Sequence, residues 1–424
     1  MIFLFVNPFW GHVNPLLDLI KGLAARGFTV RVYSGTETAD AITQAGGMFV
    51  DCTRFFLRPG EIRYAASGYL NALEAAMVMD GFMADQIQEW KPVYAISDIE
   101  SIWGSLLAEK YQLPLIIFSP THLRTLFAAG DYWGEFFREL EPYEEAFERR
   151  LQLLNEKGFP KKSMMSLLCV DPEKNYIAAV PRILQPDCES LDEDRISFFG
   201  GIGLKVKDNA YRSGKHRPLI YVTLGTTYFS DAHVFFRCCI EAFRDLDADI
   251  VMAVWKYVDI RKLGEVPENI DIRVFVDQTD VLRKCDAALF IGGINTVKDC
   301  LMLGIPMVIC PFFYDNYATA KLIREAGAGV RIDSYQPGLL RESVLRVLKE
   351  PSFREKAASL GEIIRSSQGT SEAVEWILTR IEEKQQEDFS HHSDFNKRLW
   401  RKKDKNYVYI QGHLEGRRRK RHRT

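Results

Sequence analysis

One histidine of this chain stands at a position where α/β proteins carry out chemistry. His12 follows an apolar run at 1–6 that predicts a buried strand, and it precedes a run at 15–23 with apolar residues at helical spacing. The loop between a parallel strand and its helix lies at the carboxyl edge of the sheet, where open α/β sheets bind ligands. A neutral imidazole there can accept a proton from a hydroxyl group. Local hydrogen bonding is the alternative explanation of such a histidine.

A glycine pair offers a second place for chemistry. Gly292-Gly293 separates an apolar run from a helical pattern that begins near Asn295. Glycines let a ligand approach the backbone, and the free N–H groups of a first helical turn favour an anion such as a diphosphate. Gly225-Thr226, at the end of another predicted strand, offers backbone N–H groups of the same kind. A tight turn that requires glycine is the alternative at Gly292-Gly293.

Carboxylate and amide side chains accompany the glycine pair. Asp299 lies one helical turn after Asn295, so its carboxylate can accept two ribose hydroxyls or complement the helix N-terminal dipole. Asp315-Asn316 suits sugar hydroxyls, although the same dipeptide is common in turns. The acidic triplet at 192–194 has the D-x-D form of metal-dependent sugar transferases. It lies in a connecting segment and not after a strand, so no metal site is expected.

The bulk properties restrict the class of protein. A chain of 424 residues suits two domains, and 47% apolar with 26% charged residues is typical of soluble globular proteins. A formal net charge of -2 gives no general attraction to nucleic acid. No stretch reaches the roughly twenty apolar residues of a membrane span, and the eight cysteines lack metal-binding spacing. A cytoplasmic location is therefore expected.

Strand-like and helix-like segments alternate in both halves of the chain, which predicts two parallel sheets covered by helices. The expected strands are 1–6, 28–33, 48–50, 93–97, 115–118, 219–224, 250–254, 272–276, 287–291 and 306–310. The expected helices include 70–89, 102–111, 231–244, 295–303 and 317–326. A polar stretch without large apolar residues separates the two halves and is interpreted as an interdomain linker.

Together these features resemble the GT-B nucleotide-sugar glycosyltransferases, specifically the macrolide-type UDP-glycosyltransferase family of bacteria. The resemblance covers about residues 1–380. The motifs that carry it are Gly11-His12-Val13-Asn14-Pro15, Asp98 with Trp103-Gly104, Leu224-Gly225-Thr226, Gln278, Gly292-Gly293-Ile294-Asn295-Thr296, Gly304-Ile305-Pro306 and Asp315-Asn316. It implies an α/β fold of the GT-B type, with two Rossmann-like βαβ domains whose parallel sheets face a central cleft.

The resemblance also assigns a role to each part of the chain. The expected parts are an acceptor-binding N-terminal domain at 1–207, a linker at 208–218, a nucleotide-sugar-binding C-terminal domain at 219–369, a helix that crosses back to the first domain at 370–384, and a polar, basic and disordered tail at 385–424. The tail ends in a basic run at 417–423 that predicts a weak contact with anionic membranes. A solvated tail is the favoured alternative.

In that family the residue matching His12 is the general base, and the residue matching Asp98 orients it. The predicted donor-binding residues are Gly225, Thr226, Trp255, Gln278, Gly292, Gly293, Asn295, Thr296, Asp299, Asp315 and Asn316. The resemblance implies inverting transfer of a hexose from a UDP- or TDP-sugar to a hydroxyl of a small hydrophobic acceptor, such as a macrolide, polyketide or flavonoid. The expected imidazole pKa starts from its ordinary value of about 6.5, and a carboxylate on the other nitrogen is expected to raise the basicity of the ring. No cofactor, metal or nucleic acid partner is expected.

The predicted donor site departs from the family pattern at several positions. Ile291 replaces a histidine that contacts phosphate, Asp299 replaces a glutamate, and Asn316 replaces a glutamine. Asp277 replaces a proline and Trp255 a glycine. These departures motivate an alternative, a catalytically silent or impaired GT-B protein that binds a nucleotide or apolar ligand as a partner or sequestering protein. A sugar-nucleotide epimerase has the same architecture, but it would need acidic and basic groups around the donor sugar itself.

Overall fold

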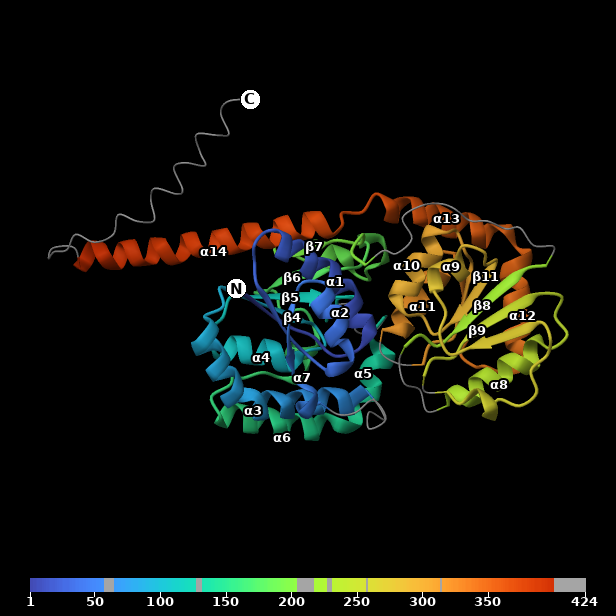
Figure 1. Ribbon diagram of the computed structural model, residues 1–424, viewed down its shortest axis with the longest axis horizontal. Coiled ribbons are helices and arrows are strands. Elements are labelled where there is room, and N and C mark those ends of the chain that lie inside the picture. The colour runs from blue at the N-terminus through green and yellow to red at the C-terminus, as the bar shows by residue number, and fades with distance from the viewer. Residues whose placement is uncertain are drawn as a thin grey trace, which may run out of the picture. The chain divides into compact units, whose positions relative to one another are not determined.

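The computed structural model describes residues 1–56, 65–126, 132–203, 217–226, 231–256, 258–312 and 315–399. Two parallel sheets with helices packed against them form the scaffold (Figure 1). The predicted α/β class with two Rossmann-like domains is confirmed. Among the described residues, no helix combines the length and apolar character that a bilayer span requires.

The N-terminal sheet contains seven parallel strands in the order β3-β2-β1-β4-β5-β6-β7. Their bounds are β1 Ile2–Phe5, β2 Val30–Ser34, β3 Met48–Asp51, β4 Tyr94–Asp98, β5 Leu115–Ser119, β6 Asn175–Ala178 and β7 Ile196–Phe198. Strands β1 and β4 are neighbours, with Phe5 opposite Ser97. Because the strands are parallel, the chain leaves both of them at the same edge of the sheet.

Seven helices accompany this sheet in the described part of the chain. They are α1 Trp10–Ala25, α2 Ala39–Gln44, α3 Ala65–Trp90, α4 Ile102–Lys110, α5 Gly134–Leu140, α6 Glu144–Glu156 and α7 Met164–Leu168. Helix α3 packs against α4 and α6. Short 3-10 turns lie at Thr36–Thr38, Thr53–Phe55, Glu141–Tyr143, Arg182–Leu184, Cys188–Ser190 and, in the second domain, Ile260–Lys262.

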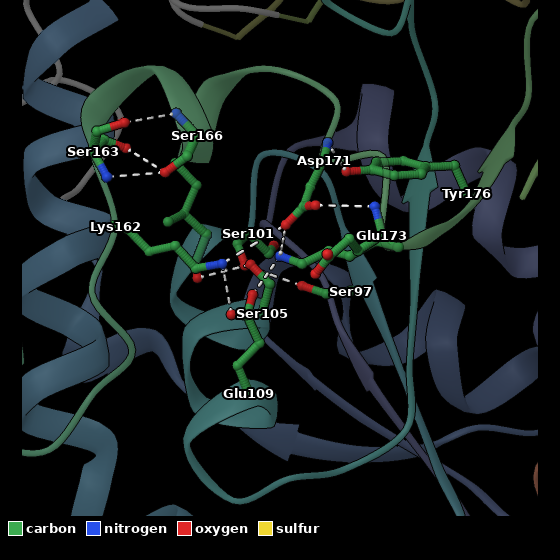
Figure 2. A network of polar contacts seen from close by, with 12 residues as sticks. Ser97, Ser101, Ser105, Glu109, Lys162, Ser163, Ser166, Asp171, Glu173 and Tyr176 are labelled. Carbon is green, nitrogen blue, oxygen red and sulfur yellow. Dashed lines mark hydrogen bonds and ion pairs between the residues drawn. The ribbon is translucent and has the colours of Figure 1, made fainter. Parts of the chain in front are cut away.

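An ionic network fastens α4 to the segment around α7 and β6 (Figure 2). Glu109, near the end of α4, accepts a 2.8 Å contact from Lys162 Nζ and a further contact from Lys174. Asp171 lies 3.8 Å from Lys162 Nζ and 3.7 Å from Lys174 Nζ. Its backbone N–H donates to the Tyr176 hydroxyl oxygen at 2.8 Å. Two carboxylates and two ammonium groups balance one another, so the network is structural.

The C-terminal sheet contains six parallel strands in the order β10-β9-β8-β11-β12-β13. Their bounds are β8 Leu219–Thr223, β9 Asp249–Ala253, β10 Ile270–Arg273, β11 Ala287–Phe290, β12 Met307–Ile309 and β13 Gly329–Arg331. The helices of this half are α8 Ala232–Phe243, α9 Gln278–Leu282, α10 Ile294–Met302, α11 Asn316–Glu325, α12 Pro337–Lys349 and α13 Pro351–Arg365. Strands β8 and β11 pair at the centre of the sheet, and all residues of both are buried.

The last helix, α14, extends from Thr370 to Leu399. It begins as the predicted crossing helix does, but it continues past the predicted end at 384, so the part of the predicted tail at 385–399 is helical. Glutamine and glutamate at 385–387 are good helix formers and favour continuation of the helix. Residues 400–424, and most of the predicted linker at 208–218, lie outside the described residues.

Residues Met1–Trp376 form one compact unit, and the chain from Ile377 forms a second. Within the first unit, the start of α14 contacts the N-terminal domain. Glu375 forms an ion pair with Arg26, which directly follows α1, and the rings of Trp376 and Phe199 meet edge to face at 6.4 Å.

Candidate active site

His12 and Asp98 form a direct side-chain pair. The imidazole Nδ1 lies 2.7 Å from Asp98 Oδ2, although the two residues are 86 positions apart. Asp98 is the last residue of β4, and His12 follows the neighbouring strand β1. The Asp98 side chain is fully buried, whereas the His12 side chain is 21% exposed. The carboxylate is therefore protected from water while the imidazole remains reachable by a ligand.

The position of His12 differs from the sequence prediction in one respect. It lies in the first turn of α1 and not in the loop before that helix, because the helix already begins at Trp10. The backbone N–H of His12 donates to the carbonyl oxygen of Phe9 at 2.9 Å. A helical residue has a restricted set of side-chain directions, so the helix helps to hold the imidazole toward Asp98.

Three carboxylates determine the charge of the imidazole. Burial disfavours the charged form, but the Asp98 charge and hydrogen bond outweigh it, and Glu100 and Asp315 add to them. The pKa of His12 is thereby raised to about 9. The sequence led us to expect that Asp98 raises the basicity of the imidazole, but it did not indicate the contributions of Glu100 and Asp315. His12 is protonated in the free protein at neutral pH, and it becomes a base at alkaline pH.

The two glycines before α10 differ in backbone conformation and in the space around them. Gly292 has a φ of +99°, and a Cβ there would lie 2.9 Å from Ile309 Cγ2, so this turn requires glycine. Gly293 has a φ of -61°, and a Cβ there would have no neighbour within 4 Å. Open space therefore lies in front of Gly293 at the N-terminus of α10, where backbone N–H groups can meet an anion. Gly292 therefore fits the tight-turn alternative, and anion binding at Gly293 stays a prediction.

The Gly225-Thr226 turn offers less than predicted. Gly225 has a φ of +68°, which favours glycine, but its N–H already donates to Thr223 Oγ1 at 3.0 Å. Thr226 is half-buried and ends the described segment at 217–226.

Three of the predicted donor-binding residues form a chain of hydrogen bonds. The side-chain amide of Gln278, at the start of α9, donates to Asp299 Oδ2 at 3.1 Å. The hydroxyl of Thr296 donates to Gln278 Oε1 at 3.4 Å. Asp277, which replaces a family proline, caps α9 by accepting the N–H of Thr279 at 2.9 Å. The Asp299 carboxylate is thus held in place at the side of α10.

Trp255 follows β9 with a left-handed φ of +60°. Its ring lies 6.0 Å from the ring of Phe275, which is 68% exposed. Two adjacent aromatic rings at the end of a strand offer a surface for stacking of a nucleobase. Phe275 was not identified from the sequence, because it falls within the predicted strand 272–276, whereas the observed strand β10 ends at Arg273.

Ile291 has a different environment from the one expected of a ligand-binding residue. Its side chain is buried in the core of the C-terminal sheet, together with Leu289 and Val308. The nearby Lys298 is also buried, and its ammonium group donates to the carbonyl oxygens of Ala179 and Ile202 at 2.9 and 3.0 Å. Neither side chain is directed to a phosphate, so contact with an anion falls to the backbone N–H groups of α10.

Residues of the C-terminal domain reach the His12–Asp98 pair. Asp315, which precedes α11, accepts a hydrogen bond from the Thr121 hydroxyl and lies close enough to raise the pKa of His12. The side-chain amide of Asn295 donates to the Gly11 carbonyl oxygen at 3.4 Å. The side-chain oxygens of Asn295 and Asn316 are buried without a hydrogen-bond partner. Two predicted sugar-binding residues and the start of α10 therefore lie close to the predicted base.

A buried ion pair beside the His–Asp pair was missed in the sequence. Glu100 Oε1 accepts a hydrogen bond from Arg124 Nη1 at 2.8 Å, and the Glu100 N–H donates to Asp98 Oδ1 at 3.0 Å. An acidic residue two positions after a strand-terminal aspartate is a signal that could have drawn attention to Glu100. Among the described residues, no group of three His, Cys, Asp or Glu side chains is arranged to hold a metal ion.

The fold and the site together define a class, the glycosyltransferases of the GT-B type. Residues 237–379 match the family described as the erythromycin biosynthesis protein CIII-like C-terminal domain. The chain is 28% identical over 376 residues to the NDP-glycosyltransferase YjiC of Bacillus subtilis (strain 168), covering 87% of this chain and 94% of that relative. It is 29% identical over 402 residues to the demethyllactenocin mycarosyltransferase of Streptomyces fradiae, covering 88% and 85%.

A similar result comes from solved structures. The glycotransferase of kitacinnamycin superposes with a TM-score of 0.74 at 25% identity, covering 89% of this chain and 98% of that one. The calicheamicin glycosyltransferase CalG4 gives a TM-score of 0.71 at 23% identity, covering 90% and 98%. The predicted resemblance is thus confirmed. Over most of its length the chain is similar to bacterial macrolide-type glycosyltransferases, and its fold is of the GT-B type.

Proposed function

We propose that the protein transfers a hexose from a UDP- or TDP-sugar to a hydroxyl of a small hydrophobic acceptor, with inversion at the anomeric carbon and with His12 as general base. The contact between His12 and Asp98, 2.7 Å long at the carboxyl edge of the N-terminal sheet, is the observation that carries this proposal.

The chemistry requires one proton transfer and one displacement. The Nε2 atom of a neutral His12 accepts the proton of the acceptor hydroxyl. The hydroxyl oxygen forms a bond to the anomeric carbon while the bond from that carbon to the diphosphate oxygen breaks. Asp98 stabilises the imidazolium that results, since its carboxylate faces Nδ1. The products are the glycoside and a nucleoside diphosphate, and in-line displacement inverts the anomeric configuration.

The C-terminal domain supplies the donor site of the proposal. The open space in front of Gly293 suits the diphosphate, since the N-terminus of α10 stabilises the negative charge that develops there. Trp255 and Phe275 stack on the base, and Asp299 accepts the ribose hydroxyls. Asp315, Asn316 and the neighbouring Asn295 bind the hexose. No metal ion or cofactor takes part in the proposed reaction.

A test of this function uses the purified full chain with a panel of macrolides and flavonoids and with several UDP- and TDP-sugars. Mass spectrometry is expected to detect a gain of one hexose on an acceptor. The anomeric configuration of the product, measured by NMR, is expected to be opposite to that of the donor. A retained configuration would exclude the direct displacement.

Two further expectations from the sequence stay predictions. The basic run at 417–423 lies outside the described residues. Its predicted weak contact with anionic membranes can be tested by comparing the vesicle binding of the full chain with that of a chain that ends at residue 383. The cytoplasmic location likewise stays a prediction.

A further inference from the structure

We propose that Glu100 and Arg124 are positioning residues, which hold Asp98 against His12 and set how readily His12 takes up a proton. The inference rests on the proposed role of His12, and it adds two residues for which the sequence assigned no function.

Glu100 first fixes the direction of the Asp98 carboxylate. Its backbone N–H donates to Asp98 Oδ1 at 3.0 Å, while the other carboxylate oxygen, Oδ2, faces His12. The carbonyl oxygen of Glu100 accepts a hydrogen bond from the Asn7 side chain at 2.9 Å. Asn7 precedes α1, so the segments that follow β1 and β4 are tied together. With Oδ1 engaged in this way, the carboxylate has one orientation and keeps Oδ2 for the imidazole.

Arg124 in turn holds the Glu100 side chain. Its Nη1 donates to Glu100 Oε1 at 2.8 Å, and its side chain is 2% exposed. The Nε atom donates to the carbonyl oxygen of Leu168 at 2.8 Å, and the guanidinium carbon lies 4.9 Å from the ring centre of Phe136. Because these contacts come from separate elements, the guanidinium is fixed in place and its charge stays beside Glu100.

Charged groups from several elements surround His12. The imidazole is faced by Asp98 at the end of β4, by Glu100 in the loop after β4 and by Asp315 before α11. Glu100 is faced by Arg124, by His12 itself and by Tyr69 of α3, and Cys169 lies beside Arg124. Burial disfavours the ionised carboxylate of Glu100, but Arg124 outweighs it and lowers the pKa of that carboxyl.

Glu100 and Arg124 have opposite effects on the pKa of His12. The Glu100 anion stabilises the imidazolium, and Arg124 partly cancels that anion. Glu100→Gln removes the negative charge and leaves the positive one, so the pKa of His12 is expected to fall. Arg124→Met leaves the negative charge uncompensated, so the pKa of His12 is expected to rise. Arg124→Lys keeps the positive charge and is expected to restore the wild-type behaviour.

The test is a direct titration of His12 by NMR in the full chain with labelled histidines, with His12→Asn used to assign its signal. The midpoint in Glu100→Gln is expected about one pH unit below the wild-type midpoint. Glu109→Gln is the matched control. Glu109, like Glu100, is paired with cationic side chains, but these are lysines of the separate network of Figure 2. Its His12 midpoint is expected to equal that of the wild type.

Turnover is measured on the same variants. The rising limb of kcat/KM against pH is expected to move to lower pH in Glu100→Gln, together with the NMR midpoint. An unchanged His12 midpoint in Glu100→Gln would overturn the inference, whatever the turnover. A shifted midpoint in a protein that transfers no sugar would support the positioning pair and would refute the proposed function instead. Glu100→Gln keeps the size of the side chain and its bond to Arg124, so the test does not depend on folding of Arg124→Met.

Discussion

The side-chain amide of Asn295 donates a 3.4 Å hydrogen bond to the carbonyl oxygen of Gly11, 284 positions earlier in the chain. This carbonyl is free because Pro15, which lies inside α1, has no N–H to give to the residue four positions before it. A proline near the start of one helix thus creates an acceptor for the start of another. The first turn of α10 is thereby held beside His12, so that in the proposed reaction the base for the acceptor hydroxyl lies next to the donor site.

Removal of the proposed base is expected to reduce the reaction strongly. His12→Ala should lower kcat by about a hundredfold or more, because general base catalysis contributes on the order of 10² to 10⁴. Steady-state kinetics with an accepted hydroxyl substrate measures this. His233→Ala is the matched control, since His233 lies in α8, where its Nε2 accepts the Asp259 N–H at 3.1 Å. Equal kcat in wild type and His12→Ala would contradict the assignment.

The rate is expected to increase with pH over an unusually alkaline range. His12 must be unprotonated to act as a base, and neighbouring carboxylates raise its pKa to about 9. The value of kcat/KM should therefore rise by about tenfold per pH unit between pH 6 and pH 8 and level off near pH 9. A profile that levels off near pH 6.5 would mean that the carboxylates do not stabilise the imidazolium in the working enzyme.

The two glycines before α10 are expected to respond differently to an added methyl group. Gly293→Ala should fold normally, because its φ is ordinary and a Cβ there meets no atom within 4 Å. It should raise the KM for the nucleotide sugar by roughly tenfold, since the methyl group occupies space needed by the diphosphate. Gly338→Ala, which also adds a Cβ in open space, is the control in α12. An unchanged KM in Gly293→Ala would place the diphosphate elsewhere.

Gly292→Ala is expected to lower the stability of the fold, in contrast to Gly293→Ala. Its φ of +99° is rarely adopted by alanine, and the added Cβ would lie 2.9 Å from Ile309 Cγ2. Thermal unfolding should therefore show a lower Tm for this variant than for Gly293→Ala. Equal Tm values would show that the turn tolerates a side chain.

Apolar runs made most of the sheet predictable, because a strand buried on both faces has few polar residues. All four residues of β1 are buried, and the same is true of β11. Strands β6, β7 and β13 were not predicted from the sequence. Each has only three or four residues, so its apolar run is too short to stand out from the segments around it.

The site was predictable to the extent that it follows strand ends. His12 was identified because it comes shortly after a buried strand, whereas its pairing with Asp98 came from the family resemblance. The two residues lie together because β1 and β4 are adjacent parallel strands. The effect of Asp98 on the basicity of His12 was expected, but the further increases in the His12 pKa due to Glu100 and Asp315 were not, because no local pattern in the chain links them to His12. Arg124 was missed for the same reason, since nothing local in the chain links it to Glu100.

Two variants are expected to distinguish residues that bind the donor from residues that stabilise the core of the C-terminal domain. Asp299→Ala should weaken UDP binding by about tenfold or more, because a hydrogen bond to a charged group contributes about 1.5–3 kcal/mol. Ile291→Ala should leave UDP binding nearly unchanged but lower the free energy of unfolding by about 2–5 kcal/mol, since its side chain is buried. Calorimetry with UDP and denaturant unfolding distinguish the two. Weaker UDP binding in Ile291→Ala alone would give that side chain a role in the donor site.

Lys298 links the two domains through hydrogen bonds that the sequence did not indicate. Lys298→Met would leave the carbonyl oxygens of Ala179 and Ile202 without this donor. The free energy of unfolding is expected to fall by roughly 2–3 kcal/mol, because buried acceptors lose their partner. Lys349→Met, at an exposed position in α12, is the control and should unfold like the wild type.

The loss of stability in Lys298→Met should also depend on pH. Burial lowers the pKa of Lys298 to about 8, below its ordinary value of 10.5. Between pH 8 and pH 10.5 the unfolded chain therefore binds more protons than the folded one, so the stability of the wild type rises with pH relative to Lys298→Met. Denaturant unfolding followed by tryptophan fluorescence at pH 7, 8.5 and 10 should show a difference between the two proteins that increases with pH. A difference that shrinks over this range would mean that the folded protein favours the charged ammonium.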